Sequence, residues 1–208
     1  RAGGQAGPHL LTGGRLQVTA PFSNLGLTET SGLDLQLNWR AQLADMGLER
    51  VPGSLALSLQ ANYLLDYTSQ ATPSSPKLDY KDTISQPAGG GVQTAQFRYR
   101  TFTTVTYNYN SWSAGLRWQH FPSIKNPAYV TNPQTTLLGA GSYDLFSLFG
   151  SWQVTDNLTV RGGVDNLFNR EAEVVGAEPG VNNALGNTLP SYYDLLGRRF
   201  YLGLKLNL

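Results

Sequence analysis

Few residues in this sequence are suited to catalysis. It contains two histidines, His9 and His120, and no cysteine, which excludes cysteine nucleophiles and thiolate metal sites. His120 could form a hydrolytic triad with Asp144 and a serine such as Ser123, but in a chain with abundant serine such sets arise by chance. No spacing of histidines and carboxylates suggests a metal site. We therefore predict that the protein is not an enzyme and needs no cofactor.

Four arginines are better candidates for a binding role: Arg98, Arg100, Arg117 and Arg161. The planar guanidinium group presents its N–H donors in a fork that matches a carboxylate. A set of such groups on one surface is therefore suited to contacts with acidic partners. Whether the four side chains share a surface depends on the elements that carry them.

Composition favours an all-β protein and excludes several classes. Charged residues make up 14% of the 208 residues, against about 25% in typical soluble domains. The formal net charge of +1 gives no broad basic field, so we expect no nucleic-acid partner. No apolar run approaches the roughly 20 residues of a membrane-spanning helix. Membrane barrels remain possible, because their strands need only about 9–11 residues each.

Apolar and polar residues alternate with the two-residue period of β-strands. From Leu33 to Leu43 every odd-numbered residue is apolar and every even-numbered residue is polar. The same pattern predicts further strands at 55–67, 95–107, 112–120, 143–154, 158–168 and 200–208, and a weaker one at 15–20. The alternation is blurred where Phe102, Leu145 and Phe149 fall on the polar side.

Short and long connections alternate between these strands. The short ones lie at 44–52, 108–110 and 155–157, and the long ones at 69–92, 125–142 and 169–196. This order is typical of an up-and-down barrel with one simple rim and one elaborated rim. The polar faces of the strands carry many charges, including the four arginines. A small dry core could not hold so many charges, whereas a hydrated or plugged lumen could, and a soluble sandwich could expose them on its outer faces.

Aromatic residues favour the membrane barrel over the soluble sandwich. They gather toward both strand ends, as in the two interfacial belts of a membrane protein. Toward the short connections lie Trp39, Tyr107, Tyr109, Trp112 and Trp152, and toward the long ones lie Tyr63, Tyr67, Phe121, Tyr143, Phe168 and Phe200. We predict an all-β, antiparallel up-and-down transmembrane β-barrel with Trp39, Tyr107, Trp112, Trp152, Tyr63 and Tyr67 at the membrane interfaces.

Two stretches near the C-terminus resemble a known family. Gly163–Asn169, with the sequence GVDNLFN, resembles the penultimate-strand motif of TonB-dependent outer-membrane receptors, and Gly197–Leu206 is similar to their closing strand. Residues 18–21 and 30–35 also resemble stretches inside their barrels. Together these stretches extend from residue 18 to residue 206, over most of the length of the chain.

The resemblance implies a 22-stranded barrel closed by an N-terminal plug. Residues 1–208 are then the last seven or eight strands, with the plug domain and the TonB box absent from this chain. The implied function is TonB-energised uptake of a scarce nutrient across the bacterial outer membrane, with a ferric siderophore as the first expectation and an oligosaccharide or another small nutrient as the next. The implied partners are outer-membrane lipid, the plug domain of the same protein, TonB and the nutrient.

The resemblance also suggests roles for individual residues. The four arginines face the lumen, where they contact acidic groups of the plug or the substrate. Residues expected to contact ligand from the extracellular loops are Tyr80, Lys81, Asp82, Tyr129, Asn132 and Asn182. The alternatives are a small self-contained outer-membrane barrel with a structural or adhesive role and, less favoured, a soluble binding module.

Overall fold

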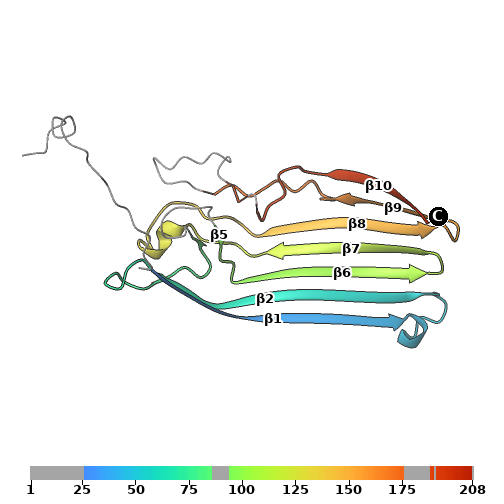
Figure 1. The fold of residues 1–208 in the computed structure, drawn as a ribbon, viewed down its shortest axis with the longest axis horizontal. Helices are drawn as coiled ribbons and strands as arrows, with labels where there is room; N and C mark the ends of the chain where they lie inside the picture. Colours follow the sequence, from blue (N-terminus) through green and yellow to red (C-terminus); the bar gives the residue numbers. More distant parts are fainter. Residues whose placement is uncertain (1–25, 86–93, 176–187, 190, 208) are drawn as a thin grey trace, which may run out of the picture.

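The long strands form one antiparallel sheet. The computed structural model describes residues 26–85, 94–175, 188–189 and 191–207. In sheet order, the long strands are β1 (Leu27–Gln42), β2 (Ser54–Gln70), β6 (Tyr99–Tyr109), β7 (Trp112–Phe121), β8 (Tyr143–Gln153), β9 (Leu158–Asp165) and β10 (Arg199–Leu206) (Figure 1). Each pairs with the next long strand along the chain, and the short β3 (Leu78–Asp79) adds to β2. The predicted all-β antiparallel fold is confirmed, and the weaker strand expected at 15–20 lies outside the described residues.

Short connections lie at one end of the sheet and long ones at the other (Figure 1). The β1–β2 turn contains the 3-10 helix η2 (Ala44–Met46), and β6 and β7 are joined by the two residues Asn110 and Ser111. Asn110 has φ of 48°, as the tight hairpin turns that match strand twist require. The long connections cover 71–98, 122–142 and 166–198 and join the opposite strand ends.

Register gives the sheet an apolar and a polar face. Partners across a ladder lie on the same side of a sheet, and here they form rows. The apolar face carries the row Trp39, Leu57, Val105, Leu116, Leu148, Val164 and Phe200. The polar face carries the row Asn38, Ser58, Thr104, Arg117 and Ser147. Leu202 and Leu204 on the apolar face are 77% and 71% exposed; soluble monomers rarely expose so continuous an apolar surface.

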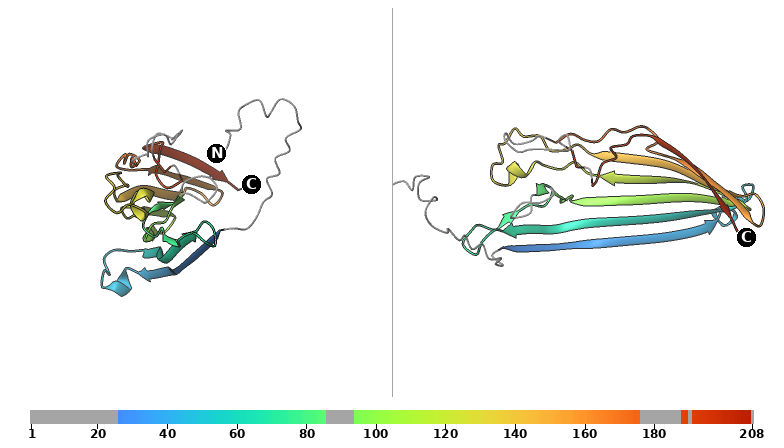
Figure 2. Two further views of the ribbon diagram at one scale, coloured as in Figure 1. Left: turned by 90° about the vertical axis from the view of Figure 1, so that its left-hand side faces the viewer. Right: turned by 45° about the horizontal axis from the view of Figure 1, so that its top comes forward.

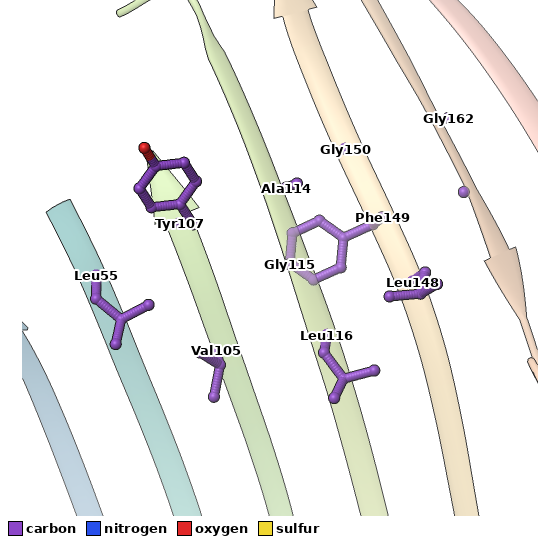
Figure 3. A pocket seen from close by; sticks show the side chains of 11 residues that line it. Leu55, Val105, Tyr107, Ala114, Gly115, Leu116, Leu148, Phe149, Gly150 and Gly162 are labelled. Atoms are coloured by element: carbon purple, nitrogen blue, oxygen red, sulfur yellow. The ribbon is translucent and has the colours of Figure 1, made fainter. Parts of the chain in front are cut away.

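Phe149 causes part of the blurred alternation in β8. It pairs with Gly115, and a Cβ atom on that glycine would lie 2.4 Å from Cζ of Phe149. The phenyl ring therefore occupies the space that a side chain at position 115 would need (Figure 3). The guanidinium carbon of Arg117 lies 5.6 Å from the ring centroid, a cation–π distance. Phe149 is thus tolerated on the polar face because Gly115 leaves room for its ring and Arg117 packs against it.

The buried core of the described residues lies in the long connections rather than in the sheet. This loop core consists of Ile84, Ala95, Phe97, Phe121, Ile124, Ala140, Tyr143, Val175, Leu189 and Tyr193. All three long connections, or the strand ends beside them, contribute to it. The connections therefore pack together as one body at that end of the sheet.

The loop core explains two errors of the sequence analysis. The strand predicted at 95–107 begins only at Tyr99, because Ala95 and Phe97 are buried in the loop core and 94–95 form β5 (Thr94–Ala95) with β4 (Ile84–Ser85). Phe121 and Tyr143 were assigned to the outer aromatic belt, but they are 4% and 0% exposed within the loop core. Their aromatic character serves packing between loops.

The sheet is open at both sides within the described residues. β1 and β10 pair on one side only and lie at opposite ends of the strand order (Figure 2). Their outer N–H and C=O groups are therefore free to pair with further strands. No helix in the described ranges is long and apolar enough to cross a membrane.

The two faces predict opposite responses to a new charge in β1. Replacing Leu35, on the apolar face, by Arg (Leu35→Arg) should lower the free energy of unfolding by about 2–4 kcal/mol, because the charge enters lipid. The neighbouring Gln36→Arg, on the polar face, should change it little. Urea unfolding of the natural protein in phospholipid vesicles measures both. Equal effects of the two variants would refute the assignment of the faces.

Candidate functional site

Arg98 and Asp82, predicted separately as lumen and loop contacts, bind each other. Nη2 of Arg98 lies 3.2 Å from Oδ2 of Asp82. The backbone of Asp82 has φ of 63°; its N–H donates to Gln96 O at 2.8 Å, and its carbonyl accepts from Lys125 N at 3.0 Å. The pair thus lies where the 71–98 connection meets the 122–142 connection. Its geometry serves loop positioning.

Tyr80 and Lys81 also make contacts within the chain. Tyr80 N donates to Tyr67 O at 2.8 Å, and Tyr80 O accepts from the Thr83 hydroxyl at 2.6 Å. Lys81 Nζ donates to Leu65 O at 2.8 Å. These bonds fasten the β2–β6 connection to the end of β2.

The 122–142 connection presents an exposed cation beside an aromatic ring. Nζ of Lys125 lies 4.4 Å from the ring centroid of Tyr129, and the tyrosine is 38% exposed. Tyr129 belongs to the 3-10 helix η3 (Pro127–Val130), which begins where Asn126 Oδ1 accepts from Ala128 N at 3.0 Å. Such a surface can receive anionic or aromatic groups. Asn132, three residues after Tyr129 in the sequence, is exposed. Asn182 lies outside the described residues.

The other three predicted arginines share the polar face. By register, Arg100 pairs with Asn62, Arg117 with Thr104 and Ser147, and Arg161 with Ser151 and Gly203. The sequence pattern alone gave this common orientation. Within the described part of the chain, no carboxylate lies within 4.0 Å of any of the three guanidinium groups.

Aromatic residues of the apolar face lie toward the short connections. Trp112 pairs with Trp152, Tyr107 packs edge-on against Trp112 at 5.4 Å between centroids, and Trp39 lies in the apolar row of β1. Further along β7, about 20 Å away at about 3.4 Å per residue, Trp118 begins a second aromatic group with Phe146.

Tyr63 and Tyr67 differ in orientation. Tyr63 pairs with Leu33 and is 45% exposed on the apolar face. A β-bulge at Leu65 then shifts the register, so that Tyr67 pairs with Thr30. Thr30 alternates with the apolar row of β1, so Tyr67 shares a face with polar residues instead of continuing the row of Tyr63.

His120 belongs to a polar cluster on the apolar face, near the long connections. Its Nδ1 lies 2.8 Å from Asp144 Oδ1, and its Nε2 lies 3.2 Å from the Tyr99 hydroxyl. Trp118 Nε1 donates to the same carboxylate oxygen at 2.8 Å. Tyr99 occupies the position at Nε2 that Ser123 would need, so the hydrolytic triad is not assembled. Among the described residues, no group of three His, Asp, Glu or Cys side chains could hold a metal ion.

A groove of about 540 Å³ also lies on the apolar face (Figure 3). Its floor contains Ala114, Gly150 and Gly162, which follow one another across β7, β8 and β9. Leu55, Val105 and Leu116 form part of its wall. All of its lining residues belong to strands, so the groove is separate from the loop surface around Tyr129.

The two motifs that resemble the receptor family meet in one network, which we call the β9–β10 latch: Asn166, Asp194 and Arg199. Asn166 has φ of 53° and is 1% exposed. Its amide donates to Arg170 O at 2.9 Å and to Asp194 Oδ2 at 3.1 Å, and its Oδ1 accepts from Arg170 N at 2.6 Å. Arg199 Nη1 lies 2.7 Å from Asp194 Oδ1. Sequence reasoning recognised the motif but not this role, because the partners are separated by a long connection.

The latch sets the charge state of Asp194. Burial alone would raise the pKa of this carboxyl group, but hydrogen bonds from Arg199, Leu196 N–H and Asn166 outweigh burial, so its pKa is lowered. Asp194 N also donates to the Tyr143 hydroxyl at 3.2 Å, which joins the latch to the loop core. Beside it, burial raises the pKa of Tyr193.

The sheet, with one apolar face and one set of long connections, defines the wall of a membrane β-barrel. Residues 3–167 match the family model of the TonB-dependent receptor-like β-barrel, and the chain belongs to this family. Its members are transporters of the Gram-negative outer membrane, which confirms that the protein is not an enzyme. No curated protein matches the chain.

A solved structure with a similar fold is a mutant of the ferric enterobactin receptor from Pseudomonas aeruginosa. The two share 19% sequence identity with a TM-score of 0.52, over 85% of this chain and 22% of the receptor chain. This chain thus spans about a fifth of the length of that receptor, and at this identity the similarity concerns the fold.

The left-handed backbone and the buried amide of Asn166 predict a graded loss of stability. Asn166→Ala should lower the free energy of unfolding by about 1–3 kcal/mol for unpaired buried groups and by about 1–2 kcal/mol for the strained φ. Asn166→Gly should show only the first loss, because glycine adopts positive φ freely. Urea unfolding of both variants, each made in the full natural protein, separates the two losses of stability. Wild-type stability of both variants would contradict the latch.

Asp194 predicts a loss of stability in acid. A carboxyl group whose pKa is lower in the folded state stabilises the fold above its unfolded pKa of about 3.9. This contribution disappears as the pH falls through the lower, folded pKa. We expect Asp194→Asn to lower stability at pH 7 and to flatten its fall between about pH 5 and pH 2. Asp156→Asn, an exposed turn variant, is the control; an unchanged pH profile for Asp194→Asn would contradict the prediction.

Proposed function

We propose that this chain is the C-terminal part of the barrel domain of an outer-membrane receptor. Residues 1–208 would supply barrel wall and outer loops, and the plug and the TonB-contacting segment would belong to the rest of the receptor. The observation that carries the proposal is the family match over 3–167, on a sheet whose apolar face suits lipid and whose polar face suits a lumen. The open edges at β1 and β10 are suited to the neighbouring barrel strands.

We further propose that the long connections form part of an extracellular mouth. In this orientation β10 runs from the outside toward the periplasm, and the short turns lie on the periplasmic side. The loop core gives the mouth a rigid base. Ligand contacts are commonly made by loops held on such a base.

The substrate we favour is a ferric siderophore. Iron chelated by several oxyanions commonly forms a negatively charged complex, and the exposed pair of Lys125 and Tyr129 suits an anionic or aromatic surface. The solved structure with a similar fold is that of a ferric enterobactin receptor, which is consistent with this class. An oligosaccharide or another small nutrient is the next candidate.

Binding to the intact receptor tests the substrate class. Lys125→Gln combined with Tyr129→Ala should weaken binding of a ferric siderophore about tenfold, because two contacts of about 0.5–1 kcal/mol each are lost. Lys77→Gln is the matched control, since Lys77 already forms an ion pair with Glu29. Tryptophan fluorescence with ferric catecholate, ferric hydroxamate and maltodextrin probes gives the affinities. Binding of maltodextrins alone would defeat the siderophore proposal.

The mass of the natural protein and its transport activity test the architecture. We expect a denatured mass several times 22.7 kDa and iron uptake that stops when TonB is deleted. A mass near 22.7 kDa with no uptake would instead support a small self-contained barrel.

A further inference from the structure

A column of paired residues on β7 and β8 changes from polar to apolar along the apolar face. From the end near the long connections, the ladder pairs of this β7–β8 column are His120 with Asp144, Trp118 with Phe146, Leu116 with Leu148, and Ala114 with Gly150. The column thus begins with hydrogen-bonding groups and ends with two of the small residues that form the floor of the groove.

The polar end of the column supplies a positioned hydrogen-bond acceptor. On the apolar face of the described strands β6 to β10, His120 and Asp144 are the only residues of the types His, Asp, Glu, Lys and Arg. His120 Nδ1 and Trp118 Nε1 both lie 2.8 Å from Oδ1 of Asp144, so two neighbours hold this carboxylate in place. No described residue donates to its Oδ2, and the side chain is 41% exposed. This oxygen is therefore available to a hydrogen-bond donor from outside the chain.

The apolar end of the column opens into the groove (Figure 3). A Cβ atom on Gly150 would have only the Ser113 carbonyl oxygen within 4 Å, at 3.2 Å. No described side chain therefore occupies the space above Gly150. On the polar face the ring of Phe149 fills the corresponding space at Gly115, so the hollow is a feature of the apolar face alone in this part of the sheet.

The distance between the two ends of the column matches the depth of one membrane leaflet. Ala114 and His120 are six residues apart, which is about 20 Å along β7 at about 3.4 Å per residue. A strand tilt of about 35–45° reduces this to about 14–17 Å along the membrane normal, close to half of the roughly 30 Å hydrocarbon core. When the polar end lies at the membrane surface, the groove lies near the middle of the membrane.

We propose that the β7–β8 column binds one glycolipid of the outer leaflet, with its sugar head group at Asp144 and one acyl chain in the groove. This inference rests on the proposed function for its orientation, in which the long connections lie outside the cell. Sugar hydroxyl and amide groups are donors that the Asp144 carboxylate and the Tyr99 hydroxyl can accept. A phosphate placed at the same position would be repelled by the carboxylate.

Both ends of the column are needed to select one lipid from the surrounding membrane. An acyl chain that moves from the bilayer onto an apolar wall releases no water, so van der Waals packing is the main gain. A hollow gives a chain more such contacts than a flat wall does, and each contact adds a small attraction. Hydrogen bonds at Asp144 then fix the head group above the groove, which makes the site specific for a lipid that carries donors.

Native mass spectrometry of the complete receptor, released from outer membranes in mild detergent, tests the proposal. We expect one glycolipid to stay bound to each receptor. Ala114→Phe fills the groove with a ring and should lower the glycolipid-bound fraction about tenfold. Ala41→Phe is the matched control, because Ala41 lies in the same ladder row but outside the groove. Equal retention by the two variants, or a wild-type receptor without bound glycolipid, would show that the proposal is wrong.

A second variant tests the head-group contact and leaves the groove unchanged. Asp144→Asn keeps an oxygen that can accept from Trp118 and His120 but removes the negative charge, and charge-assisted hydrogen bonds are about twice as strong as neutral ones. We expect glycolipid retention to fall about fivefold. Asp156→Asn, in the turn before β9, is the control. Unchanged retention in Asp144→Asn, or a phospholipid or a second receptor copy bound in place of the glycolipid, would overturn the proposal.

Iron uptake by the same cells separates this inference from the proposed function. If the wild-type receptor imports iron and Ala114→Phe still retains the glycolipid, only the lipid site is refuted. If the glycolipid binds as expected but the natural protein imports nothing, the lipid site is supported and the proposed function fails.

Discussion

A polypeptide segment in a bilayer must satisfy its backbone N–H and C=O groups without water, and an extended segment can do so only by pairing with neighbouring strands. The ladder from β1 to β10 meets this requirement for every strand between its edges. Pairing fixes register, and register places Trp39, Val105 and Phe200 in one row on the apolar face. The division into an apolar and a polar face is thus a consequence of backbone pairing combined with alternation.

A single sheet with one lipid-compatible face has no interior of its own, so the packed core forms elsewhere. It forms where the long connections meet, around Phe97, Phe121 and Tyr143. The β9–β10 latch adds a hydrogen-bonded network beside it, and Asp194 links the two through the Tyr143 hydroxyl. Packing and latch together give the connections a defined shape, and the exposed ring of Tyr129 stands on that base.

Alternation was enough to predict the long strands to within a few residues at most ends, and to place Arg100, Arg117 and Arg161 on one face. It failed where something other than lipid selects apolar residues. Phe97 has the parity of the apolar residues predicted for its strand, but it packs between loops; Phe121, which has the parity of the polar face, packs there as well. Contacts such as Arg98 with Asp82 arise in connections that have no period, so no spacing in the sequence indicated them.

Backbone pairing is incomplete at the edge strands β1 and β10. Within the described part of the chain, ion pairing is incomplete elsewhere, among cations of the polar face such as Arg117 and Arg161. Toward the long connections, Arg98, Arg170 and Arg199 form ion pairs with carboxylates of those connections. On the polar face, Arg117 and Arg161 have no such carboxylate among the described residues. In the receptor we propose, the ion pairs of the long connections and the loop core help the mouth to keep its shape for ligand.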